Sequence, residues 1–441
     1  MPGVSHPRTP TLSGSADRPG PLWPEPAAEP SRKIIVQKYG GSSVADPQRL
    51  KTVAERVAGT VRAGYHVVVV VSAMGKTTDE LYGLARLISP APPRRELDML
   101  LSSGERIAMA LLAMALHELG LDAISFTGSQ SGILTNDRHS GARIIEVRPV
   151  RIQDELARDR VVIVAGFQGM SYKREVTTLG RGGSDTTAVA LAAALGADSC
   201  EIYSDVDGVY SADPRVVAEA HHLPEVSYLE MQELADHGAK VLNAQAVQWA
   251  QQAGIIIHAR KTAGSERETR IGPPPSPPVA QGRGEAAGRA TAVAATPCVV
   301  ELQVAQHGTE ALQVLGEHSV PLRYLELHEA PDGRARLTAS LLTDDVPDWP
   351  RTLAALQAAT RGTVQASTED GMVTVVGPGV GSDPALLFRV RGELQHAGLT
   401  LRRLTTSPLR LSVWVPGAEV TAATGLLHKL LCQPSLTPKL G

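Results

Sequence analysis

The sequence is poor in aromatic residues and in cysteine. Only 3% of its 441 residues are Phe, Trp or Tyr, and the three cysteines, Cys200, Cys298 and Cys432, stand far apart with no Cys-x-x-Cys pair. This spacing indicates neither a disulfide framework nor a zinc site, so we expect reduced thiols in a cytoplasmic protein. The net charge of -3 argues against nucleic acid or an anionic membrane as the main partner.

Long hydrophobic runs are lacking as well. The longest strongly apolar run, residues 107–116, has ten residues, whereas a membrane span needs roughly 20. Residues 1–31 are rich in Pro, Ser and charged residues and contain no apolar core. We therefore expect no membrane association, no secretory signal, and a disordered Pro-rich extension at residues 1–31.

From residue 32 onward, short apolar runs alternate with helical patterns. The runs 67–71 and 161–165 are typical of strands buried on both faces. Residues 96–120 and 230–254 each predict one long helix. The alternation predicts parallel βαβ units, and hence an α/β fold with a three-layer α/β/α sandwich and a mostly parallel sheet over residues 32–272.

The composition changes after this predicted domain. Residues 273–289 are rich in Pro, Gly and Ala, which predicts a semi-rigid linker. Residues 290–441 then contain two weaker strand–helix–strand patterns, over 298–328 and 372–405. They indicate a small α+β module that occurs twice.

A glycine pair with a lysine follows the first predicted strand. In Lys38-Tyr-Gly-Gly-Ser-Ser43, the strand places the lysine at the carboxyl edge of the sheet, where open α/β folds bind ligands. A lysine point charge beside a glycine cradle suits phosphoryl transfer. The chain contains no Gly-x-x-x-x-Gly-Lys-[Ser/Thr], so this is not a Walker A loop.

A second glycine-rich stretch, Thr177 to Thr187, carries one cation, Arg181, and one anion, Asp185. It opens directly into an Ala/Leu-rich helix, whose exposed backbone N–H groups would form an anion site. The acidic turn at 203–215 comes after the next short strand. Together these segments predict a site that holds a polyphosphate next to a small anionic acceptor.

Two further features leave alternatives open. Glu105, in Leu101-Ser-Ser-Gly-Glu105, is either a solvated helix residue, which base rates favour for a lone glutamate, or a carboxylate that pairs with a substrate ammonium. Asp205-Val-Asp-Gly begins like a calcium loop, but Tyr210 stands where the sharp turn needs glycine. We therefore expect no protein metal site.

The motifs in this order and spacing resemble those of the aspartate kinases, members of the amino-acid-kinase superfamily. The resemblance covers about residues 33–270 and rests on five ordered motifs, at 36–46, 72–79, 101–105, 177–188 and 203–215, with a further match at 238–242. It implies the amino-acid-kinase fold for the catalytic domain. It also implies tandem ACT domains, which are ferredoxin-like α+β modules, for regulation and dimerisation in residues 290–441.

By resemblance, the activity is ATP-dependent phosphorylation of the β-carboxylate of L-aspartate to 4-phospho-L-aspartate, with Mg²⁺ bridging the phosphates. This is the first step of lysine, threonine, methionine and diaminopimelate biosynthesis. The implied catalytic residues are Lys38 and Asp185. The implied aspartate-binding residues are Ser42, Thr78, Glu105, Arg181 and Gly182. The implied ATP-binding residues are Lys38, Gly40, Gly41, Ser204, Asp205, Tyr210, Arg215 and Lys240.

The expected chemistry agrees with these residue types. The acceptor carboxylate is already ionised at neutral pH, so no general base is needed, and catalysis requires positioning of two anions and neutralisation of their repulsion. The resemblance also implies a homo-oligomer and a lysine or threonine effector. However, Ala305-Gln-His-Gly308 replaces the Pro-Gly turn of the family's first ACT motif, which argues against feedback inhibition.

Two alternatives remain beside this interpretation. The chain could be another amino-acid kinase, acting on glutamate, acetylglutamate or UMP, although the pair Glu105 and Arg181 suits the two ends of an α-amino acid. It could instead be a non-catalytic amino-acid-binding regulator, although Lys38, Arg181 and Asp185 are all present.

Overall fold

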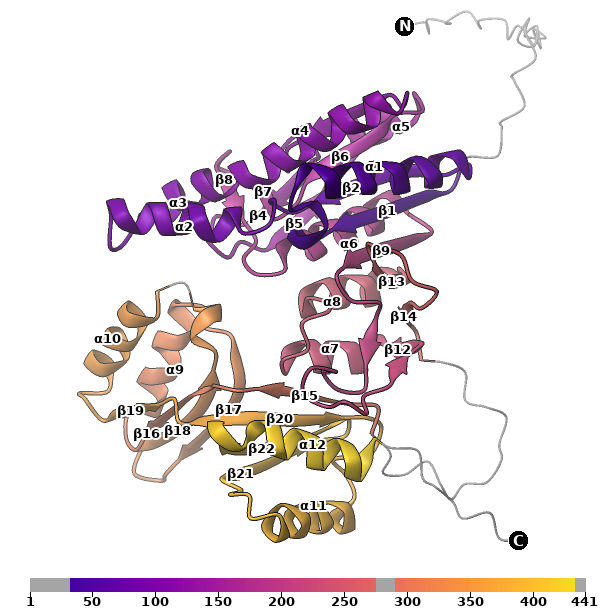
Figure 1. Ribbon diagram of the computed structural model, residues 1–441. Coiled ribbons are helices and arrows are strands. Elements are labelled where there is room, and N and C mark those ends of the chain that lie inside the picture. Colours follow the sequence, from indigo (N-terminus) through magenta and orange to yellow (C-terminus); the bar gives the residue numbers. More distant parts are fainter. Residues whose placement is uncertain (1–31, 275–289, 347, 433–441) are drawn as a thin grey trace, which may run out of the picture. The chain divides into compact units, whose positions relative to one another are not determined.

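The computed structural model describes residues 32–274, 290–346 and 348–432. The extension predicted at 1–31 and most of the linker predicted at 273–289 lie outside the described residues, so the domain boundaries there stay predictions. Figure 1 shows the described elements in order along the chain.

The central sheet has eight strands within the described residues, in the order β12-β14-β13-β9-β1-β2-β6-β3. Five neighbouring pairs, from β13 across β9, β1, β2 and β6 to β3, are parallel, whereas β14 runs antiparallel to β13. The strands are β1 (Ile34–Tyr39), β2 (His66–Val71), β3 (Ala123–Phe126), β6 (Val161–Ala165), β9 (Ser199–Ser204), β12 (Glu225–Ser227), β13 (Ile257–Lys261) and β14 (Thr269–Gly272). The mostly parallel α/β sheet predicted from the sequence is confirmed.

The unbroken valine run of β2 is explained by burial on both faces. Val67, Val69 and Val71 pack into one hydrophobic cluster with helices α1 (Pro47–Arg62) and α4 (Ser103–Glu118). Val68 and Val70 pack into another with α5 (Val150–Leu156) and α6 (Gly183–Leu195). Successive strand residues point to opposite faces, so the sheet is the middle layer of a sandwich, with α1 and α4 together on one side (Figure 1).

The two long helices expected from the sequence are each divided. The first consists of α3 (Arg94–Leu101) and α4, with a break at Ser102. The second consists of α7 (Tyr228–Asp236) and α8 (Ala244–Ala253). Gly238 lies between them with a positive φ of 119°, and a Cβ there would lie 2.4 Å from Ala295 O. The helix therefore ends where the chain must pass close to a distant strand.

The segment Arg94–Glu118 is long and apolar enough to cross a membrane by length and composition alone, with a mean hydropathy of 1.5. The core helix of a soluble protein passes the same test. Here Ala108, Leu112 and Leu116 of this segment are buried against the central sheet. Packing in the core thus explains the apolar residues on one side of this segment, whereas Ile107 and Met114 are more than half exposed.

A smaller sheet beside the central one has the strand order β5-β4-β7-β8. Its last strand, β8, leads through the loop 179–182 into α6, and the helix α2 follows the loop after β2. The bounds are β4 (Ile133–Thr135), β5 (Ile144–Val147), β7 (Gln168–Ser171), β8 (Val176–Thr178) and α2 (Thr77–Ile88). A two-stranded ribbon, β10 (Val209–Tyr210) with β11 (His222–Leu223), lies in the segment that follows β9.

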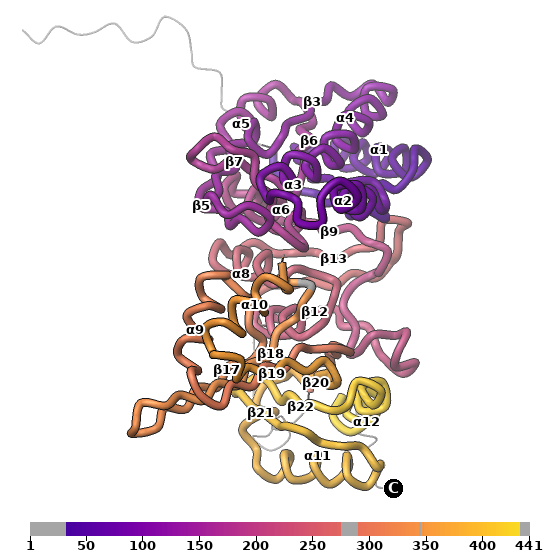
Figure 2. Tube along the Cα trace, turned by 90° about the vertical axis from the view of Figure 1, so that its left-hand side faces the viewer, coloured from indigo at the N-terminus to yellow at the C-terminus, as the bar shows by residue number. Residues whose placement is uncertain are grey.

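The C-terminal region contains two four-stranded antiparallel sheets, β17-β18-β16-β19 and β15-β20-β22-β21. Their strands are β15 (Ala292–Thr296), β16 (Val300–Val304), β17 (Leu322–Glu329), β18 (Ala335–Leu341), β19 (Val364–Ser367), β20 (Asp370–Val376), β21 (Arg403–Ser407) and β22 (Arg410–Pro416). The helices are α9 (Gly308–Glu317), α10 (Trp349–Ala359), α11 (Pro384–His396) and α12 (Val420–Leu431). Figure 2 shows α9 and α10 beside the first sheet, and α11 and α12 beside the second.

The two modules are nested rather than strictly consecutive. The first runs without interruption from β16 to β19, whereas the second takes its edge strand β15 from the chain before the first module. This pair of α+β modules agrees with the predicted ACT-like fold class.

Candidate active site

Three loops meet at the carboxyl edge of β1, β2 and β9. The backbone N–H of Gly40, after β1, donates to Tyr203 O in β9 at 3.2 Å, and Gly75 N, after β2, donates to Gly41 O at 3.0 Å. A Cβ on Gly41 would lie 2.9 Å from Ala73 O and 3.2 Å from a second carbonyl oxygen. Glycine is required at position 41 because the β1 and β2 loops touch there.

Lys38 and Asp185 form an ion pair at this edge. The Lys38 ammonium, on β1, lies 2.6 Å from Asp185 Oδ1, in the first turn of α6, and both side chains are largely buried. That carboxylate oxygen makes no other contact with a hydrogen-bond donor among the described residues. The sequence separates the two residues widely, and the fold brings them together because α6 packs on β1.

Glu105 is a buried carboxylate, and one of its two oxygens has no hydrogen-bond partner among the described residues. It lies in the first turn of α4, 3% exposed, and its Oε1 accepts a hydrogen bond of 3.1 Å from Ala73 N at the end of β2. Its Oε2 is buried and has no hydrogen-bond partner. Burial raises the pKa of Glu105 from 4.5 to about 7, against the opposing effect of backbone N–H groups including that of Ala73. Such an orphaned oxygen is a vacant acceptor for a cationic donor.

Arg181 and Gly182 lie in the loop between β8 and α6. Both are exposed, and Gly182 has a left-handed φ of 65° at the start of the helix. Asn243, the N-cap of α8, fixes this loop because its side-chain Nδ2 donates to Arg181 O at 2.9 Å. A Cβ on Gly182 would lie 2.5 Å from the Asn243 Cβ. This role of Asn243 was not predicted from the sequence.

The remaining predicted aspartate-binding residues lie on the loops around this edge. Ser42 is exposed in the 3-10 turn Gly41–Val44, and Thr78 is half-buried in the first turn of α2. In the described part of the chain, neither side chain hydrogen-bonds to Glu105 or Lys38.

The predicted nucleotide-binding residues follow β9. Ser204 Oγ accepts from Val206 N at 3.3 Å, and Tyr210 OH donates to Asp207 Oδ1 at 2.8 Å, so this turn is held by its own side chains. Asp205 and Arg215 are exposed. Arg215 pairs with Asp213 at 2.7 Å, and the charge of Lys240, which follows α7, adds to the contacts that lower the pKa of Asp213 below its ordinary value. Arg215 and Lys240 thus both favour the ionised form of one carboxylate.

The segment after β9, which contains the predicted nucleotide-binding residues, also contacts the C-terminal region. Ser211 Oγ lies 2.8 Å from His428 Nε2 of α12 and 3.0 Å from His221 Nδ1. Burial lowers the pKa of His428 below its ordinary value. In addition, the N–H of Val293 in β15 donates to Ser211 O at 2.8 Å. A single residue next to Tyr210 therefore joins the predicted nucleotide site to the second module.

The end of α7 makes a second set of contacts with the C-terminal sheets. Arg323 of β17 contacts Asp236 at 3.1 Å, and Arg410 of β22 contacts Glu233 at 3.2 Å. Arg410 Nη1 also donates to His237 Nε2 at 3.0 Å, and burial lowers the pKa of His237 to about 4. The histidine is therefore neutral at physiological pH and can accept this hydrogen bond.

No group of three or more His, Cys, Asp or Glu side chains suited to a metal ion occurs among residues 32–274, 290–346 and 348–432. Mg²⁺ bound with a nucleotide is held mainly by phosphate oxygens and water, with one or two carboxylates at most. The glycine loops at 40–41 and the adjacent Lys38 fit the phosphates of such a complex.

Comparison with known proteins agrees with this fold and assigns the chain to a family. The model of the amino acid kinase family matches residues 33–260. The aspartokinase of Mycolicibacterium smegmatis is 43% identical over 402 residues, which cover 90% of this chain and 95% of the relative. The aspartokinase of Corynebacterium glutamicum is 42% identical over 406 residues, with the same coverage. The chain belongs to the amino acid kinase family and, within it, to the aspartokinases.

Solved structures show the same fold. Aspartokinase III of E. coli, in complex with aspartate and ADP, superposes with a TM-score of 0.77 at 24% identity, over 90% of this chain and 100% of that chain. The aspartate kinase of Synechocystis superposes with a TM-score of 0.51 at 33% identity, over 91% of this chain and 70% of that chain. The first likeness supports the fold alone.

Proposed function

We propose that the protein transfers the γ-phosphoryl group of ATP to the β-carboxylate of L-aspartate and releases 4-phospho-L-aspartate and ADP. The observation that carries this proposal is the buried Glu105, whose Oε2 lacks a partner, at the edge where the Lys38–Asp185 ion pair lies. The relatives at 42–43% identity are aspartokinases. The reaction is the committed entry to lysine, threonine and methionine synthesis in this family, and we place it in the cytoplasm.

Aspartate would be held at both ends of its α-amino-acid group. The orphaned oxygen of Glu105 accepts from the α-ammonium, and the Arg181 guanidinium binds the α-carboxylate through two parallel hydrogen bonds. The backbone of Gly182 and the hydroxyls of Ser42 and Thr78 complete the pocket. This arrangement leaves the β-carboxylate free to face the nucleotide, and it disfavours acceptors that lack an α-amino acid group.

ATP would lie across the ends of β1 and β9. The loop at Gly40 and Gly41 would lie next to the transferring phosphate, which can approach closely because neither residue has a side chain. The other contacts are assigned to Ser204, Asp205, Tyr210, Arg215 and Lys240. Mg²⁺ bound together with ATP would neutralise part of the charge of the phosphates.

Catalysis in this arrangement is electrostatic. Two anions must approach in line, and the Lys38 ammonium neutralises the charge that develops between them. Asp185 positions this ammonium and, as a nearby anion, keeps it protonated. The acceptor is already ionised at neutral pH, so no residue needs to remove a proton.

The test is ADP formation from Mg-ATP with aspartate as acceptor, with hydroxylamine to trap the acyl phosphate as a hydroxamate. Aspartate-dependent hydroxamate supports the proposal. Turnover with glutamate, acetylglutamate or UMP in place of aspartate would assign the chain to another activity in the superfamily. Absence of turnover with any acceptor, while amino acids bind, would favour a non-catalytic regulator.

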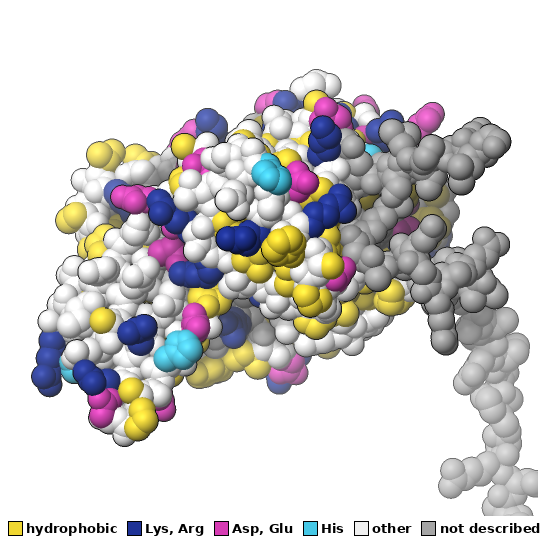
Figure 3. Space-filling model, turned by 90° about the horizontal axis from the view of Figure 1, so that it is seen from below, with side chains coloured by type: hydrophobic (Ala, Val, Ile, Leu, Met, Phe, Trp, Pro, Cys, Tyr) yellow, Lys and Arg dark blue, Asp and Glu magenta, His cyan; other side chains and the backbone are white. Residues whose placement is uncertain are grey.

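The C-terminal modules are proposed to bind an amino-acid effector and to mediate homo-oligomer formation. E. coli aspartokinase III has been solved with lysine and aspartate, and we propose lysine or threonine here. Figure 3 shows hydrophobic side chains exposed among lysine and arginine on the face seen from below, and Phe388 of α11 is 74% exposed. Adding lysine or threonine to the hydroxamate assay tests the effector, and light scattering of the purified protein tests the oligomer.

A further inference from the structure

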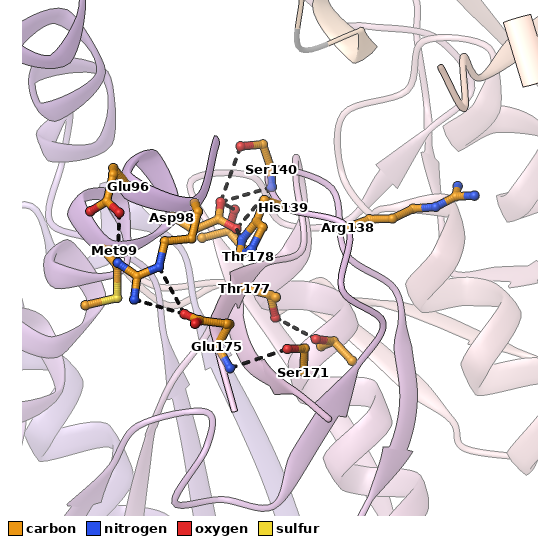
Figure 4. Close-up of polar contacts among 12 residues, drawn as sticks. Glu96, Asp98, Met99, Arg138, His139, Ser140, Ser171, Glu175, Thr177 and Thr178 are labelled. Atoms are coloured by element: carbon orange, nitrogen blue, oxygen red, sulfur yellow. Dashed lines mark hydrogen bonds and ion pairs between the residues drawn. The ribbon is translucent and has the colours of Figure 1, made fainter. Parts of the chain in front are cut away.

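Asp98 is a fully buried carboxylate outside the proposed contacts with aspartate and ATP. It lies in α3 and is 0% exposed. Its Oδ1 accepts from Thr178 Oγ1 at 2.6 Å and from Ser140 N at 3.0 Å, and its Oδ2 lies 2.8 Å from His139 Nδ1. Figure 4 shows His139, Ser140 and Thr178 of β8 around the carboxylate of Asp98, which lies on α3. A carboxylate surrounded by donors is well suited to hold separate segments together.

The segment that Asp98 holds is in a strained conformation. Ser140 has a φ of 62°, in the left-handed region that residues other than glycine rarely adopt. Its N–H donates to both oxygens of Asp98, at 3.0 and 3.1 Å, and its hydroxyl lies 3.3 Å from Oδ1. These bonds maintain a backbone turn that Ser140 would not otherwise favour.

The two segments bound by Asp98 also determine where the Arg181 loop begins. Thr178 is the last residue of β8, three positions before Arg181, and its carbonyl accepts from Ala142 N at 2.8 Å. A Cβ on Gly180 would lie 3.8 Å from Gly141 Cα, so the two segments pack on each other. The loop is thus anchored at its start through Asp98 and at Arg181 itself through Asn243.

We infer that Asp98 is a positioning residue for aspartate binding. Through Thr178 and the turn at Ser140, it fixes the start of the loop that presents Arg181, and so it sets the affinity for the α-carboxylate of the substrate. This inference rests on the proposed function, because it takes Arg181 as the carboxylate ligand.

The test uses two variants that keep the side-chain shape. In Asp98→Asn, one acceptor oxygen becomes an NH₂ group that faces other donors, and in Thr178→Val the hydroxyl donor is replaced by a methyl group. Each is expected to raise the KM for aspartate about tenfold or more, with kcat within about threefold and the KM for ATP unchanged, as expected when uniform binding is lost. Thr178→Ser, which restores the donor, is expected to return the KM close to that of the wild type.

A matched control is Glu155→Gln. Glu155 is also a buried carboxylate, and it forms ion pairs with Arg158 at 3.2 Å and Arg160 at 2.9 Å. It lies at the end of α5, and the strand β6 comes between α5 and this loop along the chain. It is expected to lower thermal stability without changing the KM for aspartate. Lowered stability with unchanged aspartate KM in Asp98→Asn and Thr178→Val would overturn the inference.

A readout without substrate separates this inference from the proposed function. Leu179 N donates to Phe167 O at 2.9 Å and Gly183 N to Gly180 O at 3.1 Å, so amides on both sides of Arg181 are hydrogen-bonded and are expected to exchange slowly in the wild type. Hydrogen exchange in a peptide over residues 176–186 is expected to accelerate in Thr178→Val and not in Thr178→Ser. Equal exchange in the two variants would overturn the anchoring role. If the wild type does not phosphorylate aspartate, the proposed function fails, and this comparison still decides whether Asp98 holds the loop.

Discussion

The clearest quantitative prediction concerns the ionisation of Glu105. Burial raises its pKa from 4.5 to about 7, and one pKa unit corresponds to about 1.4 kcal/mol. The ionised carboxylate therefore destabilises the free folded protein by roughly 3 kcal/mol relative to the protonated form. Because the pKa is higher in the folded than in the unfolded state, this contribution makes the protein most stable below about pH 4.5, and stability is lost as the pH rises through about 7.

Substrate binding favours the ionised form of Glu105 instead. The α-ammonium of aspartate needs the ionised form, so kcat/KM for aspartate is expected to rise with pH and to level off above about pH 7. One pH unit below the pKa, kcat/KM should be about one tenth of its plateau. In the complex the ammonium favours the charged carboxylate, so the corresponding pKa seen in kcat is expected to lie lower.

The assay is a series of initial rates at varied aspartate from pH 5.5 to 8.5, for the wild type and for Glu105→Gln. The variant is expected to lose the pH dependence, to raise the KM for aspartate by about 10- to 150-fold through loss of a charged hydrogen bond, and to unfold at a higher temperature than the wild type at pH 8. Glu155→Gln should keep the wild-type profile. A flat wild-type profile, together with near-normal activity of Glu105→Gln, would refute the assignment of Glu105 to the ammonium.

Three further predictions concern other parts of the site. Lys38→Ala is expected to lower kcat by about 100- to 1,000-fold with a modest change in aspartate KM, and near-normal turnover would contradict its role. Arg181→Lys keeps the charge but loses the two-point fork, so aspartate KM should rise about tenfold or more with kcat little changed; an unchanged KM would remove Arg181 from the site. His428→Gln, which disturbs the contact with Ser211, should raise the KM for ATP severalfold in initial-rate measurements without affecting that for aspartate, and an effect on aspartate alone would exclude this coupling.

The fold of the catalytic domain could be predicted because its signals are local. The valine run of β2 and the glycine loop after β1 each identify their element from neighbouring residues alone. The contacts that these elements make with distant parts of the chain could not be predicted in the same way. The break between α7 and α8 depends on Gly238 passing close to Ala295, a contact between residues far apart in the chain. A glycine within the pattern of 230–254 weakens a helix but does not by itself identify that contact.

The candidate site was likewise predicted only in part. Lys38, Arg181 and Asp185 stood out in their glycine-rich segments, whereas only the resemblance decided for Glu105, and the roles assigned to all four remain predictions. The residues that hold the site were missed because their importance depends on tertiary burial. Asp98, between leucine and methionine in a helix, has the sequence context of an ordinary surface aspartate, and only its complete burial beside Thr178 distinguishes it.

The nested arrangement of the two C-terminal modules has a consequence for the order of synthesis. The edge strand β15 leaves the ribosome about 70 residues before its partner β20, which at ordinary rates of translation is a delay of about 4 to 15 seconds. During that interval the whole first module, β16 to β19, can fold, because its sheet contains only its own strands. An unpaired edge strand is prone to wrong pairing, but Val293 of β15 can already bond to Ser211 in the catalytic domain, which is made earlier. The catalytic domain can therefore hold β15 in place until the last module is complete.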